Sequence, residues 1–308
     1  MDLPAALADP AKAGALISWN MNVAASGPRQ AELRAALARE DLFVLVAELF
    51  LTDTAKLADV VLPAASFLEF DDLVSSYFHL TLSAQSKVEE PPGEALPNME
   101  IFRRLARALD LPQPELYESD RAIIDRLLAR SGHGIDFAAL QAQGTATLYP
   151  DPVLAFAEGR FATPSGRIEL ASPRAAADGH PLAPLPLADA PAAGGRLRLL
   201  SPASPWLMND SYGNDPGIQK QLGAADITLH PEDAARLGLQ RGQAVRVASP
   251  AGALDLTLAL DAALVTPGTA FAPKGRWGEN VNALFEGRKS DLGESTAVHG
   301  QEVTVSAR

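Results

Sequence analysis

Polar side chains that could bind a ligand stand directly after two short apolar runs near the start of the chain. Asn20 and Asn22 follow the first run, and Glu48 follows the second. Amide and carboxylate groups bind ligands through hydrogen bonds. Asn at the end of a strand is also a common turn residue, because it tolerates left-handed backbone and bonds its own main chain. From these residues alone, both ligand binding and turn formation stay open.

The apolar runs themselves predict the elements that position these side chains. Residues 15–19, 42–46 and 60–62 are short and rich in apolar or β-branched residues, which is typical of buried strands in a parallel sheet. The apolar spacing of residues 30–39 predicts an amphipathic helix, and residues 52–59 predict a loop with a short helix. Because such sheets bind ligands at the carboxyl ends of their strands, Asn20, Asn22 and Glu48 are expected at one edge.

Other chemistry-bearing residues give weaker signals. Glu69 and Asp71–Asp72 could form an acid–base pair, but a solvated acidic loop is the better interpretation because no histidine stands at a matching spacing. The chain has no cysteine, which excludes a protein-held Fe–S cluster, a thiolate metal ligand and a disulfide within it. Its five histidines show no metal-binding spacing. We therefore predict no metal-ligating and no catalytic residue in this chain.

Composition bounds the class of protein. The 308 residues carry a formal charge of −12, with 47% hydrophobic and 21% charged residues, which indicates a globular protein of about two domains. The negative charge argues against nucleic acid and anionic membranes as partners. No apolar stretch is long enough to span a membrane. The first residues lack the features of a signal peptide, so we expect a cytoplasmic protein, with the periplasm left open.

The pattern changes along the chain and predicts four regions. Residues 1–63 form the end of a Rossmann-like α/β domain, and residues 64–171 form a mixed α/β segment with helices at 99–109 and 119–130 and a strand at 167–170. Residues 172–195, rich in Pro, Ala and Gly, form a linker. Residues 196–308 form a β-rich domain with strands expected at 197–200, 226–229, 244–249, 253–260, 269–271 and 302–305, and a helix at 231–237.

Several motifs in this order resemble one known family. They are TDTAKLADVVLP (52–63), PPGEALPN (91–98), TPSGRIEL (163–170), LHPEDAARLGLQRGQAVRVASPAG (229–252) and NVNALF (280–285). Together they resemble the C-terminal half of molybdopterin oxidoreductases of the dimethyl-sulfoxide-reductase type. The resemblance implies a partial doubly wound parallel-sheet domain followed by a six-stranded double-psi β-barrel.

The resemblance also implies a cofactor and partners. The family binds one or two molybdopterin guanine dinucleotides, and we expect the bis form with molybdenum or tungsten. In the family, the metal ligand, any Fe–S cluster and most of the substrate funnel belong to the N-terminal half. The resemblance therefore implies a partner chain or missing N-terminal half that carries them, with electron-transfer subunits as further partners. Formate, nitrate, sulfoxide, thiosulfate and polysulfide stay open as substrates.

Twelve positions are implied as cofactor contacts. Asn22 matches a family asparagine, with Asn20 as the alternative, and Glu48 and Asn98 stand where the family often carries Asp. For Asn98, capping of the following helix explains the residue equally well. The loop SPASPWLMN is similar to one that holds the pterin, and further positions match in the last third of the chain. The remaining implied contacts are Ser201, Ser204, Trp206, Leu207, Asn209, Lys274, Asn282 and His299.

Two other functions stay possible at this point. The chain could be a non-catalytic structural or cofactor-carrying module of a larger redox complex, which keeps the fold without the chemistry. It could also be an unrelated α/β-plus-barrel protein whose motifs match by accident. Polar groups at the strand ends favour the oxidoreductase, because a structural relic has no need of them.

The predicted linker leads to a first test. Limited proteolysis of the folded chain should cut between Ser172 and Gly195, because an extended segment rich in Pro and Gly is accessible to proteases. The fragments can be identified by mass spectrometry. Resistance of this segment, together with cleavage inside 200–300, would overturn the predicted boundary.

Overall fold

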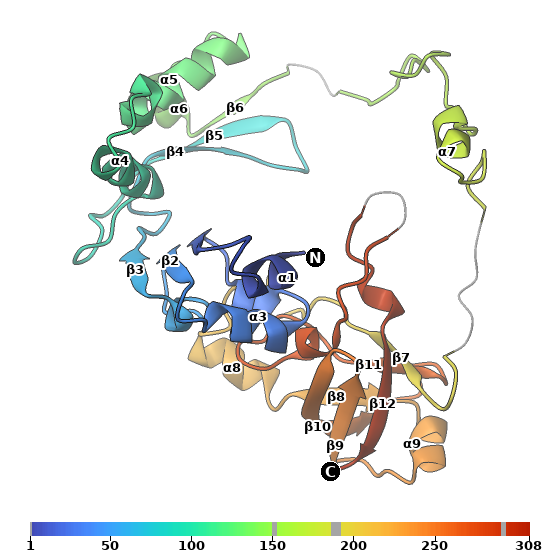
Figure 1. Cartoon of the computed structure of the whole chain (residues 1–308). Coiled ribbons are helices and arrows are strands. Elements are labelled where there is room, and N and C mark those ends of the chain that lie inside the picture. Colours follow the sequence, from blue (N-terminus) through green and yellow to red (C-terminus); the bar gives the residue numbers. More distant parts are fainter. Residues whose placement is uncertain (1, 150–152, 186–191, 291–293) are drawn as a thin grey trace. The chain divides into compact units, whose positions relative to one another are not determined.

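The computed structural model describes residues 2–149, 153–185, 192–290 and 294–308 (Figure 1). The chain divides into two compact units. Unit 1 comprises Met1–Ala65, Pro92–Ile101 and Pro191–Arg308, and unit 2 comprises Ser66–Pro91 and Phe102–Ala190. Within the described ranges, the helices are all too short or too polar to cross a bilayer. The domain boundaries expected from the sequence stay a prediction.

The first part of unit 1 is a three-stranded parallel sheet of order β1-β2-β3. Its strands are β1 (Ala15–Trp19), β2 (Phe43–Glu48) and β3 (Val60–Pro63). The strand β2 lies in the centre and pairs with both neighbours, so that Val46 is aligned with Ser18 on one side and Val61 on the other. The parallel arrangement confirms the predicted α/β class.

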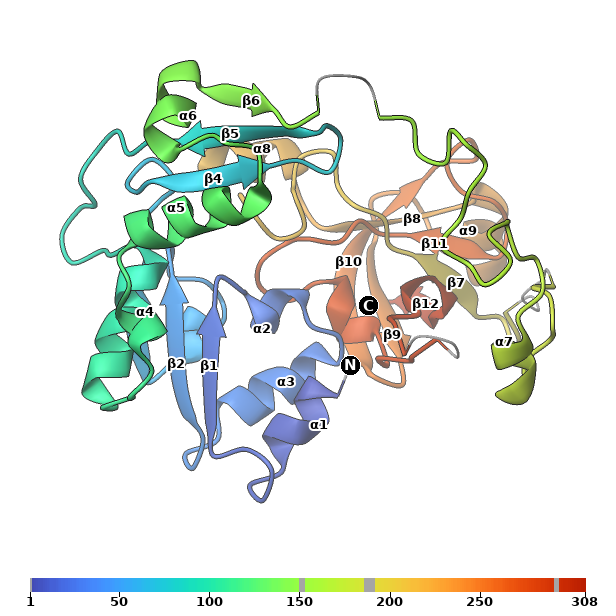
Figure 2. The same cartoon turned by 90° about the horizontal axis from the view of Figure 1, so that it is seen from above.

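Helices cover one face of this sheet (Figure 2). They are α1 (Leu3–Ala8), α2 (Val23–Ser26), α3 (Gln30–Leu37) and the 3₁₀ helix η1 (Ala55–Leu57). Leu33 and Leu37 of α3 pack with Val44 and Val46 of β2 in one apolar core. Burial of these side chains stabilises the sheet, at about 25 cal/mol per Å² of apolar surface removed from water.

Two details differ from the expectation for these strands. The central strand is buried as predicted, but Val60 and Val61 of β3 are 36% and 39% exposed. The run is apolar, yet β3 is paired on one side only in this sheet, so its side chains have fewer neighbours. In addition, β2 extends to Glu48, which is therefore the last residue of the strand and not the first residue after it.

The second part of unit 1 is a closed six-stranded barrel of order β10-β8-β11-β7-β12-β9. Two of its pairs, β10 with β8 and β11 with β7, are parallel and the other four are antiparallel. This mixed order agrees with the double-psi barrel that the resemblance implied. The strands are β7 (Leu197–Leu200), β8 (Asp226–Leu229), β9 (Ala244–Ser249), β10 (Gly252–Leu260), β11 (Thr269–Phe271) and β12 (Glu302–Ala307).

The barrel is filled by aliphatic side chains from every strand. Leu199, Ile227, Val247 and Val303 are among those with no exposed surface. A hairpin joins β9 to β10 through Pro250 and Ala251. Short helices complete the barrel at its ends: α8 (Pro216–Leu222), α9 (Pro231–Leu237), η3 (Val281–Leu284) and η4 (Val298–Gly300).

Unit 2 is an antiparallel sheet with helices on one face. Its strands are β4 (Asp72–Ser75), β5 (Thr81–Gln85) and β6 (Thr145–Thr147). Ile124, Leu128, Phe137 and Leu140 form its core against the sheet. The helices of this stretch of chain are α4 (Asn98–Ala108), which begins in unit 1, the 3₁₀ helix η2 (Pro114–Tyr117), α5 (Asp120–Ser131), α6 (Phe137–Gln143) and α7 (Pro173–Ala177).

Residues 98–170 confirm some of the local features expected from the sequence and contradict others. The helix expected at 119–130 is α5, and Ser119 caps it, because its hydroxyl oxygen accepts a hydrogen bond from the Ala122 amide. The helix α4 begins at Asn98, which is therefore a helical residue and not the cap before Met99. The strand predicted at 167–170 is wrong, since the backbone there is irregular. The turn before it is present, with Gly166 at φ 67° and its amide bonded to the Thr163 carbonyl.

Buried amide side chains join the two parts of unit 1. Gln30 Nε2 donates to the carbonyl oxygens of Ala24 (2.8 Å) and Gly278 (2.9 Å). Asn280 Nδ2 donates to the carbonyl oxygens of Ala25 (3.0 Å) and Arg276 (2.7 Å). Gln30 and Asn280 are 1% and 4% exposed, so these bonds satisfy backbone groups that water does not reach. We call this set of contacts between residues 22–30 and 276–285 the seam.

Removal of one seam amide should destabilise unit 1. Asn280→Ala leaves the Arg276 carbonyl without this donor, at a cost of about 1–3 kcal/mol, whereas the Ala25 carbonyl keeps its hydrogen bond from Asn282 Nδ2. The midpoint of urea unfolding measures the loss. Gln113→Ala is the matched control, because that exposed side chain makes no capping hydrogen bond. Equal midpoints for the two variants would show that the seam does not carry stability.

Candidate functional site

A cavity of about 330 Å³ lies beside the seam, between α2 and the barrel. Four residues implied from the sequence line it: Ser201, Asn209, Lys274 and Asn282. The first follows β7, the next two come from loops at the same end of the barrel, and Asn282 lies in η3. The volume is at the lower end of the range for small-molecule sites. The other lining residues are Ala25, Ser26, Pro28, Asp210, Gly275, Phe285, Thr296 and Val298.

The hydroxyl of Ser201 has the character of a ligand-binding group. The residue is 2% exposed, and its Oγ has no hydrogen-bond partner among the described residues. A buried hydroxyl without a partner costs free energy, so such a group in a cavity wall calls for a ligand or water. One N–H of the Asn282 side-chain amide donates to the Ala25 carbonyl (2.7 Å), so its Oδ1 and its second N–H are the groups that can meet a ligand.

A smaller cavity of about 190 Å³ adjoins the first, since Lys274 lines both. Ser204, Trp206 and Leu207 of the predicted loop lie in its wall. Leu207 is buried, but the Trp206 side chain is 47% exposed and can act as an apolar platform. Ser204 Oγ accepts a hydrogen bond from the Trp206 amide, so here the serine also fixes the turn. The structure therefore brings seven of the twelve implied residues to two neighbouring cavities.

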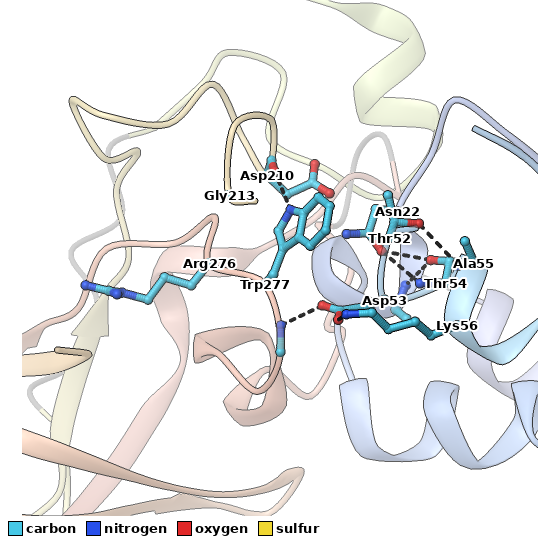
Figure 3. A network of polar contacts seen from close by, with 12 residues as sticks. Asn22, Thr52, Asp53, Thr54, Ala55, Lys56, Asp210, Gly213, Arg276 and Trp277 are labelled. Carbon is cyan, nitrogen blue, oxygen red and sulfur yellow. Dashed lines mark hydrogen bonds and ion pairs between the residues drawn. The ribbon is translucent and has the colours of Figure 1, made fainter. Parts of the chain in front are cut away.

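Asn22 lies at the carboxyl end of the sheet and holds the Thr54 turn (Figure 3). Its Oδ1 accepts hydrogen bonds from Thr54 N (3.1 Å) and Thr54 Oγ1 (2.9 Å). Asp53 in the same turn accepts a hydrogen bond from the amide of Gly278 (2.5 Å), which connects the turn to the barrel. The Asn22 side chain thus has a structural role in fixing the Thr54 turn through its Oδ1.

Glu48 stands near the same corner as a half-buried carboxyl. Burial raises the pKa of Glu48, the hydrogen bond from the Leu49 amide opposes the rise, and the negative charge of Asp210 adds to it. A carboxyl that is harder to ionise is suited to hydrogen bonding with a ligand. Glu48 is not among the lining residues of the larger cavity, whereas Asp210, whose negative charge helps to raise the pKa of Glu48, is one of them.

The remaining implied residues lie outside the two cavity walls. Asn20 is exposed in a left-handed turn (φ 50°), which fits the turn alternative. Asn98 begins α4, and its Oδ1 is buried without a partner in the described part of the chain. His299 lies in η4 beside Val298, which does line the larger cavity. Their roles as cofactor contacts stay predictions.

Sequence reasoning missed several residues that shape the larger cavity. Gly275 must be glycine, since a Cβ there would lie 2.0 Å from the Asn209 carbonyl oxygen and φ is 106°. Trp277 packs so closely on Gly213 that a Cβ there would lie 2.4 Å from the indole. Asp210 follows the predicted Asn209 directly, but it was not predicted because Asp is common in turns. The run KGRWG (274–278) was the available signal, because two glycines around a tryptophan indicate close packing.

The donors present fit a large organic cofactor better than a bare metal ion. Among the described residues, His, Asp and Glu form no cluster of three that could hold a metal. The larger cavity instead offers a hydroxyl, amides and the Lys274 ammonium, which suit the polar edges of a heterocycle and anionic phosphates.

Two family models match separate parts of the chain. Residues 5–108 match a model described as molybdopterin oxidoreductase, and residues 197–301 match one described as molydopterin dinucleotide binding domain. The second match covers the barrel strands β7 to β11 and most of the lining of both cavities. The larger cavity therefore lies where the two matched regions meet.

Known proteins are similar along almost the whole chain. The probable oxidoreductase YoaE of Bacillus subtilis is 32% identical over 94% of this chain and 44% of its own length. A putative catalytic chain of dimethyl sulfoxide reductase from Halobacterium salinarum is 27% identical over 85% of this chain and 33% of its own. Acetylene hydratase from Pelobacter acetylenicus has the same fold, with a TM-score of 0.79 and 22% identity over 99% of this chain and 46% of its own. The chain spans less than half the length of these relatives.

The stability of two serine variants, one at Ser201 and one at Ser249, tests whether the Ser201 hydroxyl serves the fold. Ser201→Ala should leave the free energy of unfolding unchanged to within about 0.5 kcal/mol, because the hydroxyl makes no hydrogen bond to the described chain. Ser249→Ala should lower it by about 1 kcal/mol, since Ser249 Oγ donates to the Leu284 carbonyl (2.7 Å). Urea unfolding of both variants measures the difference. A larger loss for Ser201→Ala would mean that Ser201 serves the fold.

Proposed function

The chain belongs to the molybdopterin oxidoreductase family, and on that premise we propose that it forms the cofactor-binding C-terminal portion of a molybdenum or tungsten oxidoreductase. The cofactor is molybdopterin guanine dinucleotide in its bis form. A further polypeptide portion carries the metal ligand, any Fe–S cluster and most of the substrate funnel. Electron-transfer subunits are additional partners.

The observation that carries this proposal is the larger cavity with its unpartnered hydroxyl. Ser201, Asn209, Lys274 and Asn282 come from separate loops and meet at one end of the barrel. A structural module has no reason to bury the Ser201 hydroxyl without a partner, whereas a cofactor-binding portion does. This favours a cofactor-binding portion over a purely structural module.

The residues of this chain bind and orient the cofactor. The Ser201 hydroxyl and Asn282 Oδ1 meet polar edges of the pterin, and the Lys274 ammonium meets an anionic group. Leu207 and Trp206 exclude water from the adjoining wall. When bound, the cofactor supplies two-electron redox chemistry at its metal, and the protein supplies position and electrostatics.

Two properties of the chain support its role as a portion of a larger enzyme. The chain has no cysteine, and it spans 44% of the length of YoaE. Dimethyl sulfoxide reductase, nitrate reductase and formate dehydrogenase are names of relatives, and their substrates differ. The reaction type is therefore proposed without a substrate.

Purification of the chain from its native host tests the proposal. Mass spectrometry and metal analysis should find a cysteine-rich polypeptide, covalently continuous or associated, together with pterin and molybdenum or tungsten. A matched preparation from a strain deleted for the gene controls for contaminants. Recovery of the chain alone, without pterin or metal, would contradict the proposal and support the non-catalytic module.

A further inference from the structure

Asp210 occupies a rigid position in the wall of the larger cavity. It lies in the loop 208–213, where Asn209 and Tyr212 have left-handed backbone (φ 56° and 68°) and Met208 bridges Ser211. The backbone carbonyl of Asp210 accepts a hydrogen bond from Trp277 Nε1 (2.7 Å). This hydrogen bond holds the Asp210 backbone in place and does not involve its carboxylate, which can therefore bind a ligand.

The buried groups around this carboxylate do not neutralise it. Figure 3 shows the Asn22 side chain facing Asp210, so the buried Asn22 Nδ2 is the neutral donor nearest to this carboxylate. Burial raises the pKa of Asp210, and the charge of Asp53 adds to the rise, while its own backbone and the Asn22 amide lower it. Lys56 pairs at 3.8 Å with Asp53, and among the described residues no cation forms an ion pair with Asp210.

A carboxylate of this kind has a matching ligand chemistry. It presents two acceptor oxygens side by side, which suits a ligand with two adjacent N–H donors. A 2-amino-4-oxopyrimidine ring, which pterin and guanine share, presents such a pair through its ring N–H and its amino group. Ser201 and Lys274 on the same wall supply donors for the remaining acceptors of the ligand.

We propose that the Asp210 carboxylate recognises the amino–imino edge of a 2-amino-4-oxopyrimidine ring bound in the larger cavity. The inference rests on the proposed function and adds to it a residue that sets specificity for the ring. Asp210 is a binding residue, with Trp277 and Gly275 as the residues that position its loop. Neither the pattern of the sequence nor the family matches assign this role to it.

Calorimetric titration of the full chain with defined probes tests the assignment. The probes are 6-hydroxymethylpterin and guanosine monophosphate, and inosine monophosphate serves as the guanine analogue without the amino group. Asp210→Asn replaces an acceptor by a donor and should weaken binding of the recognised ring about ten-fold or more. Asp215→Asn is the matched control, because Asp215 caps α8 through the Ile218 amide and Asn caps equally well.

The two probes distinguish the two sources of the ring. Tight binding of 6-hydroxymethylpterin, lost in Asp210→Asn, assigns the wall to the pterin. Tight binding of guanosine monophosphate with weak binding of inosine monophosphate, a preference lost in Asp210→Asn, assigns it to the guanine. Either result supports the proposal.

Two results would overturn it in different ways. If wild type and Asp210→Asn bind a probe equally, the assignment of Asp210 is wrong while the cofactor cavity stands. If wild type binds neither ring, both the assignment and the cavity's proposed role fail.

The pH dependence of binding is an independent readout that does not depend on the folding of a variant. Affinity of the wild type for the recognised ring should fall as the pH drops through the pKa of Asp210, because a protonated carboxyl loses one acceptor. The charged groups near Asp210 are Glu48 and Asp53 from the sheet side and Lys274 on the cavity wall. An affinity that stays constant down to the pKa range of an exposed carboxyl would contradict the proposal.

Discussion

The hydrogen bonds of the seam are the constraint on which the rest of unit 1 depends. Gln30 and Asn280 are buried amides that donate to backbone carbonyls, and beside the seam Asp53 accepts from the backbone of Gly278. A buried amide is costly unless it is fully paired, so these side chains permit one relative placement of the sheet and the barrel within unit 1. The larger cavity exists because of that placement, since its walls come from α2 on one side and from barrel loops on the other.

The cavity wall shows how a fold can leave polar atoms available. Glycine at 213 and 275 allows the loop 208–213 to approach the run 274–278 more closely than any side chain would permit. Trp277 then fixes the loop through the backbone of Asp210. Since the loop is fixed by backbone contacts, the side chains of Asn209 and Asp210 need no partners within the protein. Rigidity of this kind lowers the entropy lost when a ligand binds.

Much of the fold follows from local patterns, whereas the site depends on contacts between distant residues. The strands β1, β7, β8, β9 and β11 match their predicted ranges, because short apolar runs between turn residues specify strands locally. Residues 167–170 have a similar pattern but no pairing strand, so the prediction failed there. Asp210 was missed because its role depends on Trp277, 67 residues away in sequence. Asn22 was expected as a ligand contact, but its bond to Thr54 could not be inferred from spacing.

The hydrogen-bond acceptors of the seam affect how far the amino-acid sequence around it can change during evolution. Most of the acceptors are main-chain oxygens, those of Ala24, Ala25, Arg276 and Gly278, which every amino acid possesses. A change of side chain at those positions does not remove the acceptor, so the joint depends on the backbone path, which buried Ala24 and Ala25 and the left-handed Gly278 (φ 75°) help to fix, and on the identity of the few amide donors. Mutational drift can thus replace most of the surrounding sequence before the geometry of the joint changes. A fold shared at 22% identity with acetylene hydratase is compatible with such a tolerant joint.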